Sequence, residues 1–554
     1  MKRAGFIASQ GASSLARALR APYYFVKAMG VRAPERLHVA PQDIRTADPT
    51  VADEIYAGYF SFDGKIVAMQ GRSPFSIQPP SAAWRRSLAG FSWLRHLQAA
   101  DKALARANAR ALADDFLLSR NIFVDDPAFE PPVVARRTLS WLAQSPILLE
   151  GADQEFYERF MNSLGGNVRM LMRALAHEPP GLDRLTCAVA LAEFGVCADA
   201  GRKFQDCATD LLDAELARQI SSDGGHVGRN PQALVDLLLD LLPLRQAYAV
   251  RGRRPPERLL ACIERMIPML RMMQHGDGSL ALFNGMSVAS PDSLATILAH
   301  DEAPGAPPLD APQSGYRRIE AGDALVIVDA GGPPPLEYSG AAHAGCLSFE
   351  YSIGGERLVV NCGAPASGSD VSRRIARATA AHSTLVVEDR SSCEIAGEAG
   401  FGRRLAGRIV AGPREVIADR RSAASGEWLE FSHDGYAREF GLLHRRKLAL
   451  TSAWLVGEDQ LVTLGAEQAN DFVLRFHVHP NVALSPTGDG CGIDIVSPGG
   501  IRLTFEVEGL TPAIEESVFF AAPGAPRRCA QIVVAGRALP EAHVRWSFTR
   551  VDGG

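Results

Sequence analysis

Three residues that can transfer protons or bind a ligand stand at the ends of three consecutive predicted strands. His343 precedes the alternating segment LSFEYSI, Asn361 ends the apolar run RLVVN, and His382 opens the run HSTLVVED. A half-buried sheet needs no histidine at such positions, whereas an imidazole can exchange protons near neutral pH. Because the ends of neighbouring strands meet in space, we expect the two histidines to converge. The stretch 338–389 is therefore the first candidate for a functional site.

The strands that would carry these residues belong to a C-terminal half that is rich in short alternating segments. From residue 315 to the end, nearly every segment is typical of a strand, and Gly, Asp and Pro turns join them. This pattern predicts a large antiparallel β-sandwich over 315–554. The sequence DEAPGAPPLDAPQS at 301–314 has four prolines and little that can enter a core, so it is predicted to be an interdomain linker.

The N-terminal half predicts helices instead. Strong helix formers with apolar residues at three- and four-residue steps begin near Phe91, and Pro- and Gly-containing turns separate the helical segments. After a first helical stretch from 96 to 119, the expected segments are 133–148, 153–177, 181–200, 203–220, 230–250, 256–274 and 290–300. They predict a tandem array of helical hairpins over 91–300, without a sharp sequence repeat.

The first 90 residues are predicted to be irregular with some helix, including a hairpin around Asp63-Gly64. The first 30 are basic and mildly amphipathic. They lack the continuous apolar core of a signal peptide, so they are expected either to lie on a membrane surface or to pack on the protein body. No clear export signal is present, so the compartment stays open and the cytoplasm is one alternative.

Composition excludes several classes of protein. The 554 residues are 47% hydrophobic and 22% charged, which is typical of a globular protein of two or three domains. A net charge of -5 gives no reason to expect nucleic acid as a partner. Nine cysteines without a C-x-x-C pair are expected to be buried free thiols. No apolar run is long enough to predict a transmembrane segment.

Several motifs resemble one known family. HAGCLSFE, VVNCG and RIARATAAHSTLVVED are similar to the C-terminal domain of the heparinase II/III family of polysaccharide lyases, as are HDGY at 433–436, HRR at 444–446 and QISSDGGHVGRNP in the helical half. The resemblance implies an incomplete (α/α) toroid followed by an antiparallel β-sandwich, with the active site in the cleft between them. It also implies a carbon–oxygen lyase that cleaves uronic-acid-containing glycans by β-elimination, with an anionic polysaccharide as its partner.

Such a reaction sets chemical requirements. A base must remove the weakly acidic proton beside the uronate carboxylate, an acid must protonate the leaving oxygen, and hydrogen-bond donors or a cation must stabilise the enolate-like intermediate. The candidates for proton transfer are His343, His382, Tyr338 and His226. The candidates for substrate binding are Arg229, Asn230, Arg377 and Asn284.

The resemblance also raises a metal site. In the family, residues at these positions can hold a structural zinc, which here would fall to His343, Asn361 and His382, with Asn361 in the place of an aspartate. The alternative is that the histidines act directly. Gly345 replaces a second family acid, and Ala233-Leu234 stand where the family has a catalytic tyrosine. A second hypothesis is therefore a non-catalytic protein that binds glycans or assists envelope polysaccharide assembly.

Overall fold

The computed structural model describes residues 30–551 apart from 101–102, 120–124, 302–304, 368, 398–404, 424–425 and 466–468. The described chain forms two compact units. The first comprises the residues up to Gln219 together with Leu237–Ile263, and the second comprises Ile220–Asp236 and Glu264 onward. The interpretations of the first 29 residues lie outside the described part of the chain.

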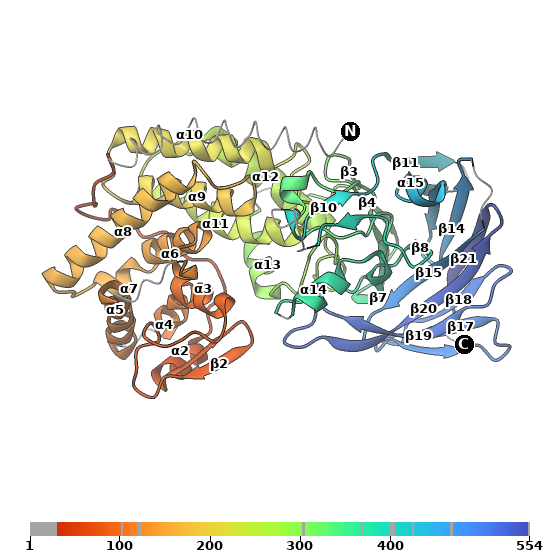
Figure 1. Ribbon diagram of the computed structural model, residues 1–554, viewed down its shortest axis with the longest axis horizontal. Coiled ribbons are helices and arrows are strands. Elements are labelled where there is room, and N and C mark those ends of the chain that lie inside the picture. The colour runs from red at the N-terminus through yellow and green to blue at the C-terminus, as the bar shows by residue number, and fades with distance from the viewer. Residues whose placement is uncertain are drawn as a thin grey trace. The chain divides into compact units, whose positions relative to one another are not determined.

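The first unit is helical apart from one small hairpin, β1 (Tyr59–Phe62) with β2 (Lys65–Ala68), close to the hairpin expected at Asp63-Gly64. Asp153 caps α8 because its carboxylate accepts a hydrogen bond from Phe156 N, and α2 and α6 each have proline in the first turn. Its helices are drawn from red to yellow in Figure 1. They are α2 (Pro49–Tyr56), α3 (Ala82–Gly90), α4 (Leu94–Ala100), α5 (Ala103–Leu118), α6 (Pro131–Ala143), α7 (Ser145–Leu149), α8 (Gln154–Ala174), α9 (Leu182–Cys197) and α10 (Arg202–Gln219).

Helices α11 (Pro231–Val250) and α12 (Glu257–Met272) are each divided between the two units. Every predicted helical segment from 96 to 300 contains a helix, the last being α13 (Pro291–Leu298). Among the described helices, none is both long enough and apolar enough to cross a bilayer.

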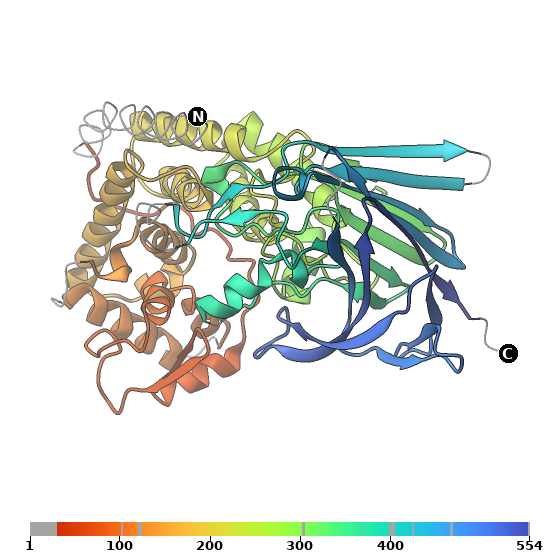
Figure 2. The same cartoon turned by 45° about the vertical axis from the view of Figure 1, so that its right-hand side comes forward.

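The second unit contains two large antiparallel sheets. One has the order β19-β20-β15-β7-β6-β5-β4-β3, with β8 paired to β15 beside this path; the other has the order β11-β12-β13-β14-β21-β18-β17-β16. In Figure 2 the β11–β12 hairpin is the pair of long cyan strands, and its strands pair over their full length. The strands are β3 (Asp310–Ala311), β4 (Tyr316–Ala321), β5 (Ala324–Asp329), β6 (Phe349–Ile353), β7 (Glu356–Val360), β8 (Leu385–Val387), β9 (Glu394–Ile395), β10 (Ile409–Ala411), β11 (Val416–Ala423), β12 (Gly426–His433), β13 (Leu442–Leu450), β14 (Trp454–Thr463), β15 (Asn470–Val478), β16 (Ala483–Pro486), β17 (Gly492–Val496), β18 (Arg502–Val507), β19 (Ala513–Phe519), β20 (Arg527–Ala538) and β21 (Ala542–Arg550).

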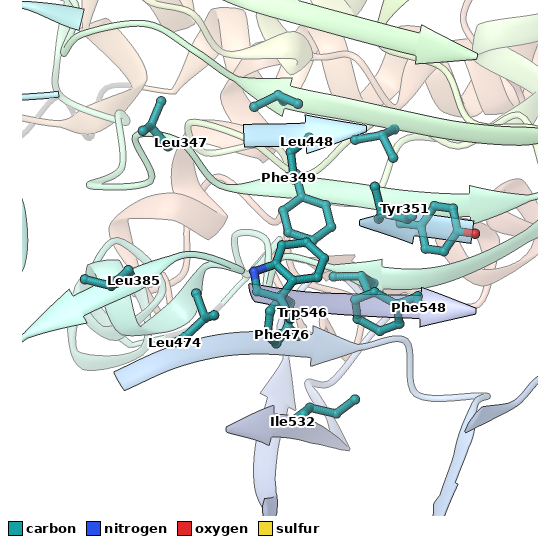
Figure 3. Packing of buried hydrophobic residues seen from close by; sticks show 14 of the residues in the cluster. Leu347, Phe349, Tyr351, Leu385, Leu448, Leu474, Phe476, Ile532, Trp546 and Phe548 are labelled. Carbon is teal, nitrogen blue, oxygen red and sulfur yellow. The ribbon is translucent and has the colours of Figure 1, made fainter. Parts of the chain in front are cut away.

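Aromatic side chains from both sheets form the core of this sandwich. Phe349 of β6 stacks on Trp546 of β21 with ring centroids 5.6 Å apart, and Phe476 of β15 meets the same indole edge-on at 4.8 Å (Figure 3). Gly457 of β14 leaves room for the indole, because a Cβ there would lie 2.1 Å from Trp546 Cζ2. Packing at this density fixes the two sheets face to face.

The packing also places some helical-half segments with the sheets. Residues 220–236 and 264–300, which the sequence assigns to the helical domain, belong to the sheet unit. Part of the predicted linker is ordered there too, because β3 pairs with β4. The sheet unit therefore holds the turn with His226 and Arg229, and the loop with His275 and Asn284, as well as the strands.

Candidate functional site

The two histidines that the sequence singled out lie against each other in the sheet unit. His343 stands in the loop between the short 3-10 helix Leu336–Tyr338 and β6, and His382 follows the 3-10 helix Thr379–Ala381. Their ring centroids are 5.1 Å apart at 80°, and His343 Nδ1 lies 3.1 Å from His382 Nε2. Both residues are buried.

The neighbouring carbonyl fixes where the protons sit in this pair. His382 Nδ1 lies 2.8 Å from the Ala378 oxygen, which can only accept, so this nitrogen carries the proton. In a neutral ring His382 Nε2 is then the acceptor, and His343 Nδ1 donates to it. The proton-free nitrogen of the pair is His343 Nε2, which has no hydrogen-bond partner among the described residues.

Burial keeps this pair uncharged. Desolvation lowers the pKa of His382 below its ordinary value and lowers the pKa of His343 well below it, with the charges of His382 and Arg377 adding to the effect on His343. At neutral pH both rings are therefore neutral. The pair can accept a proton at His343 Nε2 and pass part of the resulting charge to His382 through their shared hydrogen bond.

Gly345 is part of the site because it has no side chain. A Cβ at this position would lie 2.7 Å from His382 Cδ2, closer than carbon atoms approach, and 3.1 Å from its Nε2. The acidic residue that the family resemblance leads one to expect after His343-Ala344 would therefore collide with the present position of His382. The present position of the His382 ring therefore requires a residue without a side chain at position 345.

The Asn361 side chain contacts the carboxylate of Glu350 and not the ring nitrogens through which His343 and His382 face each other. Its Nδ2 donates to Glu350 Oε1 at 3.1 Å, and its Oδ1 accepts from Ser383 N at 2.9 Å. Glu350 is fully buried and also lies 3.0 Å from His275 Nε2. An aspartate at 361 would place a second carboxylate against Glu350, so the amide suits this position.

These contacts do not fit a zinc site. The facing nitrogens of His343 and His382 share a proton, and Asn361 uses both ends of its side chain within the protein. Across the described residues, no group of three or more His, Cys, Asp or Glu side chains could hold a metal ion. The chemistry below is therefore assigned to side chains.

Arg377 shapes the loop that carries His343. Its Nε donates to the Ala342 oxygen at 2.8 Å and its NH2 donates to the Ser339 oxygen at 3.0 Å, while Ala344 N donates to the Arg377 oxygen at 2.9 Å. Burial lowers the pKa of Arg377 to about 10, so the guanidinium stays charged at neutral pH. Its charge faces the loop carbonyls.

His226 and Tyr338 form a second group near this loop. The imidazole meets the phenol edge-on, with ring centroids 6.2 Å apart. Gly228 N donates to His226 Nδ1 at 3.0 Å, so the neutral ring carries its proton on Nε2, and burial lowers the pKa of His226 to about 4. Tyr338 is only partly buried and ends the 3-10 helix that precedes His343.

Arg229, expected to bind substrate, directs all its side-chain donors at the protein. Nε donates to the Ser314 oxygen, NH1 to the oxygens of Gly331 and Gly332, and NH2 to the Gly315 oxygen and to Asp329. The five N–H groups are thus occupied, and the guanidinium fixes the 226–231 turn to the sheet. Arg229 itself has a φ of +62°, which such contacts must stabilise.

Asn284 links that anchor to His343. Its Nδ2 donates to Asp329 Oδ2 and to the Tyr316 hydroxyl, both at 3.0 Å, and its Oδ1 accepts from His343 N at 3.3 Å. Asn230 caps the start of α11, because its Oδ1 accepts from Gln232 N at 2.9 Å. Its Nδ2 has no hydrogen-bond partner among the described residues.

Sequence reasoning missed three buried members of this site. Asp329, Tyr316 and Glu350 hold Arg229, Asn284 and Asn361, but each lies within a predicted strand and was not singled out. A signal was present for Asp329, since it ends the otherwise apolar run ALVIVD. Glu350 gave the opposite signal, because its alternating segment predicts a solvent-facing side chain.

Comparisons with known proteins bear on this site. Residues 303–547 match the model of the family described as heparinase II/III-like, C-terminal. The FtsZ-localized protein C of Caulobacter vibrioides is 32% identical over 539 residues, which cover 94% of this chain and 91% of the relative. The chain belongs to the heparinase II/III-like family.

Solved structures of that family share the fold. A heparinase III structure matches with a TM-score of 0.72 at 13% identity, covering 99% of this chain and 91% of the other. A mutant of the heparan sulfate lyase HepC from Pedobacter heparinus matches with a TM-score of 0.64 at 15% identity, covering 100% of this chain and 91% of the other. The heparinase II/III-like architecture of a helical toroid followed by an antiparallel β-sandwich is thus present in this protein, as the sequence predicted.

Proposed function

We propose that this protein is a polysaccharide lyase that cleaves uronic-acid-containing glycans by β-elimination, with His343 as the base. One observation carries the proposal: the His343–His382 hydrogen bond runs in a direction that leaves a proton-free nitrogen on His343. Removal of the proton beside the uronate carboxylate needs such a nitrogen, held neutral at working pH.

The same pair also stabilises the positive charge that His343 acquires when it takes the proton. When His343 Nε2 takes the proton, its ring becomes cationic, and its Nδ1–H donates more strongly to His382 Nε2. His382 cannot turn away, because its own Nδ1–H is bound to the Ala378 oxygen. The proposed role of His382 is therefore to orient and stabilise the base.

Tyr338 is the proposed acid for the leaving oxygen. It is partly exposed, it lies five residues before His343 in the same loop, and it contacts the His226 ring. Asn230 is proposed to bind the substrate carboxylate through its Nδ2. Arg377, Asn284 and Arg229 are proposed to serve binding indirectly, because their donors hold the loops that carry these groups.

The experiment is incubation of the purified full-length protein with a panel of uronate polysaccharides, followed by ultraviolet detection of the unsaturated product. Polymer cleavage with product is expected for the wild type and not for His343→Gln. His96→Gln is a matched control, since His96 lies in the helical unit on α4. If the wild type binds a polymer and leaves its length unchanged, the lyase proposal is wrong.

A second candidate has its own support. The relative with 32% identity over nearly the whole chain is named for localisation with FtsZ, whereas the lyase structures are 13–15% identical. Ala233 and Leu234, at the place of the family tyrosine, are buried apolar residues. The second candidate is therefore a non-catalytic glycan-binding protein that associates with FtsZ. Co-sedimentation with FtsZ polymers, together with glycan binding without cleavage, is its expected signature.

A further inference from the structure

A fully buried ion pair lies between the two sheets. Arg446 on β13 donates from Nε to Asp459 Oδ1 at 2.8 Å and from NH2 to Asp459 Oδ2 at 3.1 Å. Neither side chain is exposed to solvent. Asp459, on β14, also accepts from Trp546 Nε1 at 2.8 Å and contacts His444 Nε2 at 2.7 Å. The carboxylate is thus held from four directions, which fixes the guanidinium plane.

The remaining nitrogen of Arg446 reaches two loops that lead into strands β6 and β8 of the opposite sheet. NH1 donates to the Leu347 oxygen at 2.6 Å and to the Ser383 oxygen at 3.1 Å. Leu347 lies two residues after Gly345, whose open face receives the His382 ring, and Ser383 directly follows His382. One nitrogen atom therefore joins the two loops whose separation sets the His343–His382 distance.

Other contacts show that these loops are held in a constrained form. Leu347 has a φ of +62°, a conformation that non-glycine residues adopt only when their surroundings impose it. Ser383 is fixed from other sides as well, since its N donates to Asn361 and its hydroxyl donates to the Val360 oxygen at 2.7 Å. Arg446 NH1 contacts both loops from the opposite sheet, in addition to the direct bond of Thr379 Oγ1 to the Ala344 oxygen at 2.7 Å.

A gain in folding stability is a weak explanation for the buried Arg446–Asp459 ion pair. Buried ion pairs lose much hydration free energy, and well-packed apolar replacements are often as stable. A planar guanidinium that binds a carboxylate on one side and two carbonyls on the other provides a fixed geometry that an apolar side chain does not.

We propose that Arg446, held by Asp459, is a positioning residue that sets the spacing and alignment of the His343–His382 pair. The catalytic consequence of this role rests on the function proposed above, but the positioning itself does not. Arg446 touches no substrate; it acts through the backbone of the two histidine-bearing loops.

The test compares Arg446→Lys with Arg445→Lys. Lysine has one point-like ammonium and cannot bind Asp459 and both carbonyls in the same plane. Arg445 is the neighbouring, exposed residue on the same strand, which makes it a matched control. Hydrogen–deuterium exchange at the imidazole C2 position, read by mass spectrometry, gives the pKa and accessibility of each of the 13 histidines without a substrate.

Arg446→Lys is expected to raise the pKa of His343 and His382 towards the ordinary value of about 6.5 and to speed their exchange, because the loosened pair admits water. Arg445→Lys is expected to leave both unchanged. If Arg446→Lys does not fold, the double variant Arg446→Met with Asp459→Leu removes both buried charges together and should give the same shift. A folded variant at Arg446 with unaltered His343 and His382 would overturn the proposal.

Kinetic measurements on the same variant give a second, independent test. If the protein is a lyase, Arg446→Lys should lower kcat and shift the acidic limb of the pH–rate profile with little change in KM. If the wild type cleaves none of the polymers, the proposed function fails, while the histidine exchange data still decide whether Arg446 positions the pair.

Discussion

Two histidine pairs in the sheet unit have nearly the same ring geometry, but their hydrogen-bond chains end on different partners. His343 and His382 meet with centroids 5.1 Å apart at 80°, and His433 and His444 meet with centroids 5.1 Å apart at 90°. In the second pair Gly435 N donates to His433 Nδ1, His433 Nε2 lies 3.2 Å from His444 Nδ1, and His444 Nε2 lies 2.7 Å from Asp459.

Every ring nitrogen of the His433–His444 pair is thus used by the protein. The His343–His382 pair has one nitrogen with no partner among the described residues, and that nitrogen lacks a proton. Ring geometry and burial are alike, so neither distinguishes a reactive pair from a structural one. The difference lies in what each hydrogen-bond chain ends on.

The largest expected difference is in catalysis. His343→Gln keeps a donor for His382 but cannot take a proton, so the rate of glycan cleavage should fall by about 10²–10⁴-fold. The melting temperature should stay close to that of the wild type. Initial rates of unsaturated product and a thermal melt check this; equal activity in the variant would remove His343 from the mechanism.

A substitution in the His433–His444 pair should instead lower the free energy of unfolding. His444→Leu leaves His433 Nε2 without its acceptor, at a cost of about 1–3 kcal/mol for this buried group, and removes one of the two hydrogen bonds to Asp459 Oδ1. Urea denaturation monitored by fluorescence measures this free energy of unfolding. His543→Leu on the neighbouring strand β21 is the control, because its side chain is mostly exposed. A destabilisation no greater than the control's would contradict the structural role.

Gly345→Ala tests whether the His343–His382 pair needs the empty space beside the His382 ring to keep its geometry. The added methyl must push His382 away, since its carbon would lie 2.7 Å from the ring. Overpacking of this kind costs about 1–3 kcal/mol in the free energy of unfolding. We expect that loss together with reduced activity. Gly340→Ala, in the same loop but with open space around its Cβ position, should show neither effect.

The smallest effect is the pH dependence of stability that both pairs share. The folded-state pKa values of His343 and His433 are well below the unfolded value near 6.5, mainly because the rings are buried. The unfolded chain therefore binds more protons below pH 6.5, so stability is present above that pH and is lost as the pH falls. Each such histidine contributes a slope of about 1.4 kcal/mol per pH unit.

Urea denaturation between pH 7 and pH 5 measures this slope. It should be smaller in His343→Gln than in the wild type, because one depressed histidine has been removed. A slope that does not change in this variant would mean that His343 is not held neutral by the fold.

Much of the fold was predictable because its patterns are local. Apolar spacing in the helical half and short alternating segments in the sheet half predict the elements, and the motifs around His343 and His382 identify the family. The convergence of these two residues followed from their place at strand ends. Such signals survive without knowledge of the tertiary contacts.

The site's supporting residues were less predictable because their roles depend on distant partners. Arg229 has the chemistry of an anion binder, yet residues 314–332 occupy all its donors. Glu350 lies on a strand that is buried on both faces, since the chain around His275 and Leu282 bonds to it. Sequence periodicity reports which face a side chain takes, but not what covers that face.

The division of the chain has a practical consequence for dissecting the protein. A recombinant fragment cut at the boundaries of the family match, 303–547, would lack residues 220–236 and 264–300, although both segments fold with the sheets. Asp329 would lose Arg229, and Glu350 would lose His275. Such a fragment would leave two carboxylates without the partners that they have in the intact chain, so we expect it to be less stable. Its failure to fold would therefore say nothing about the intact chain.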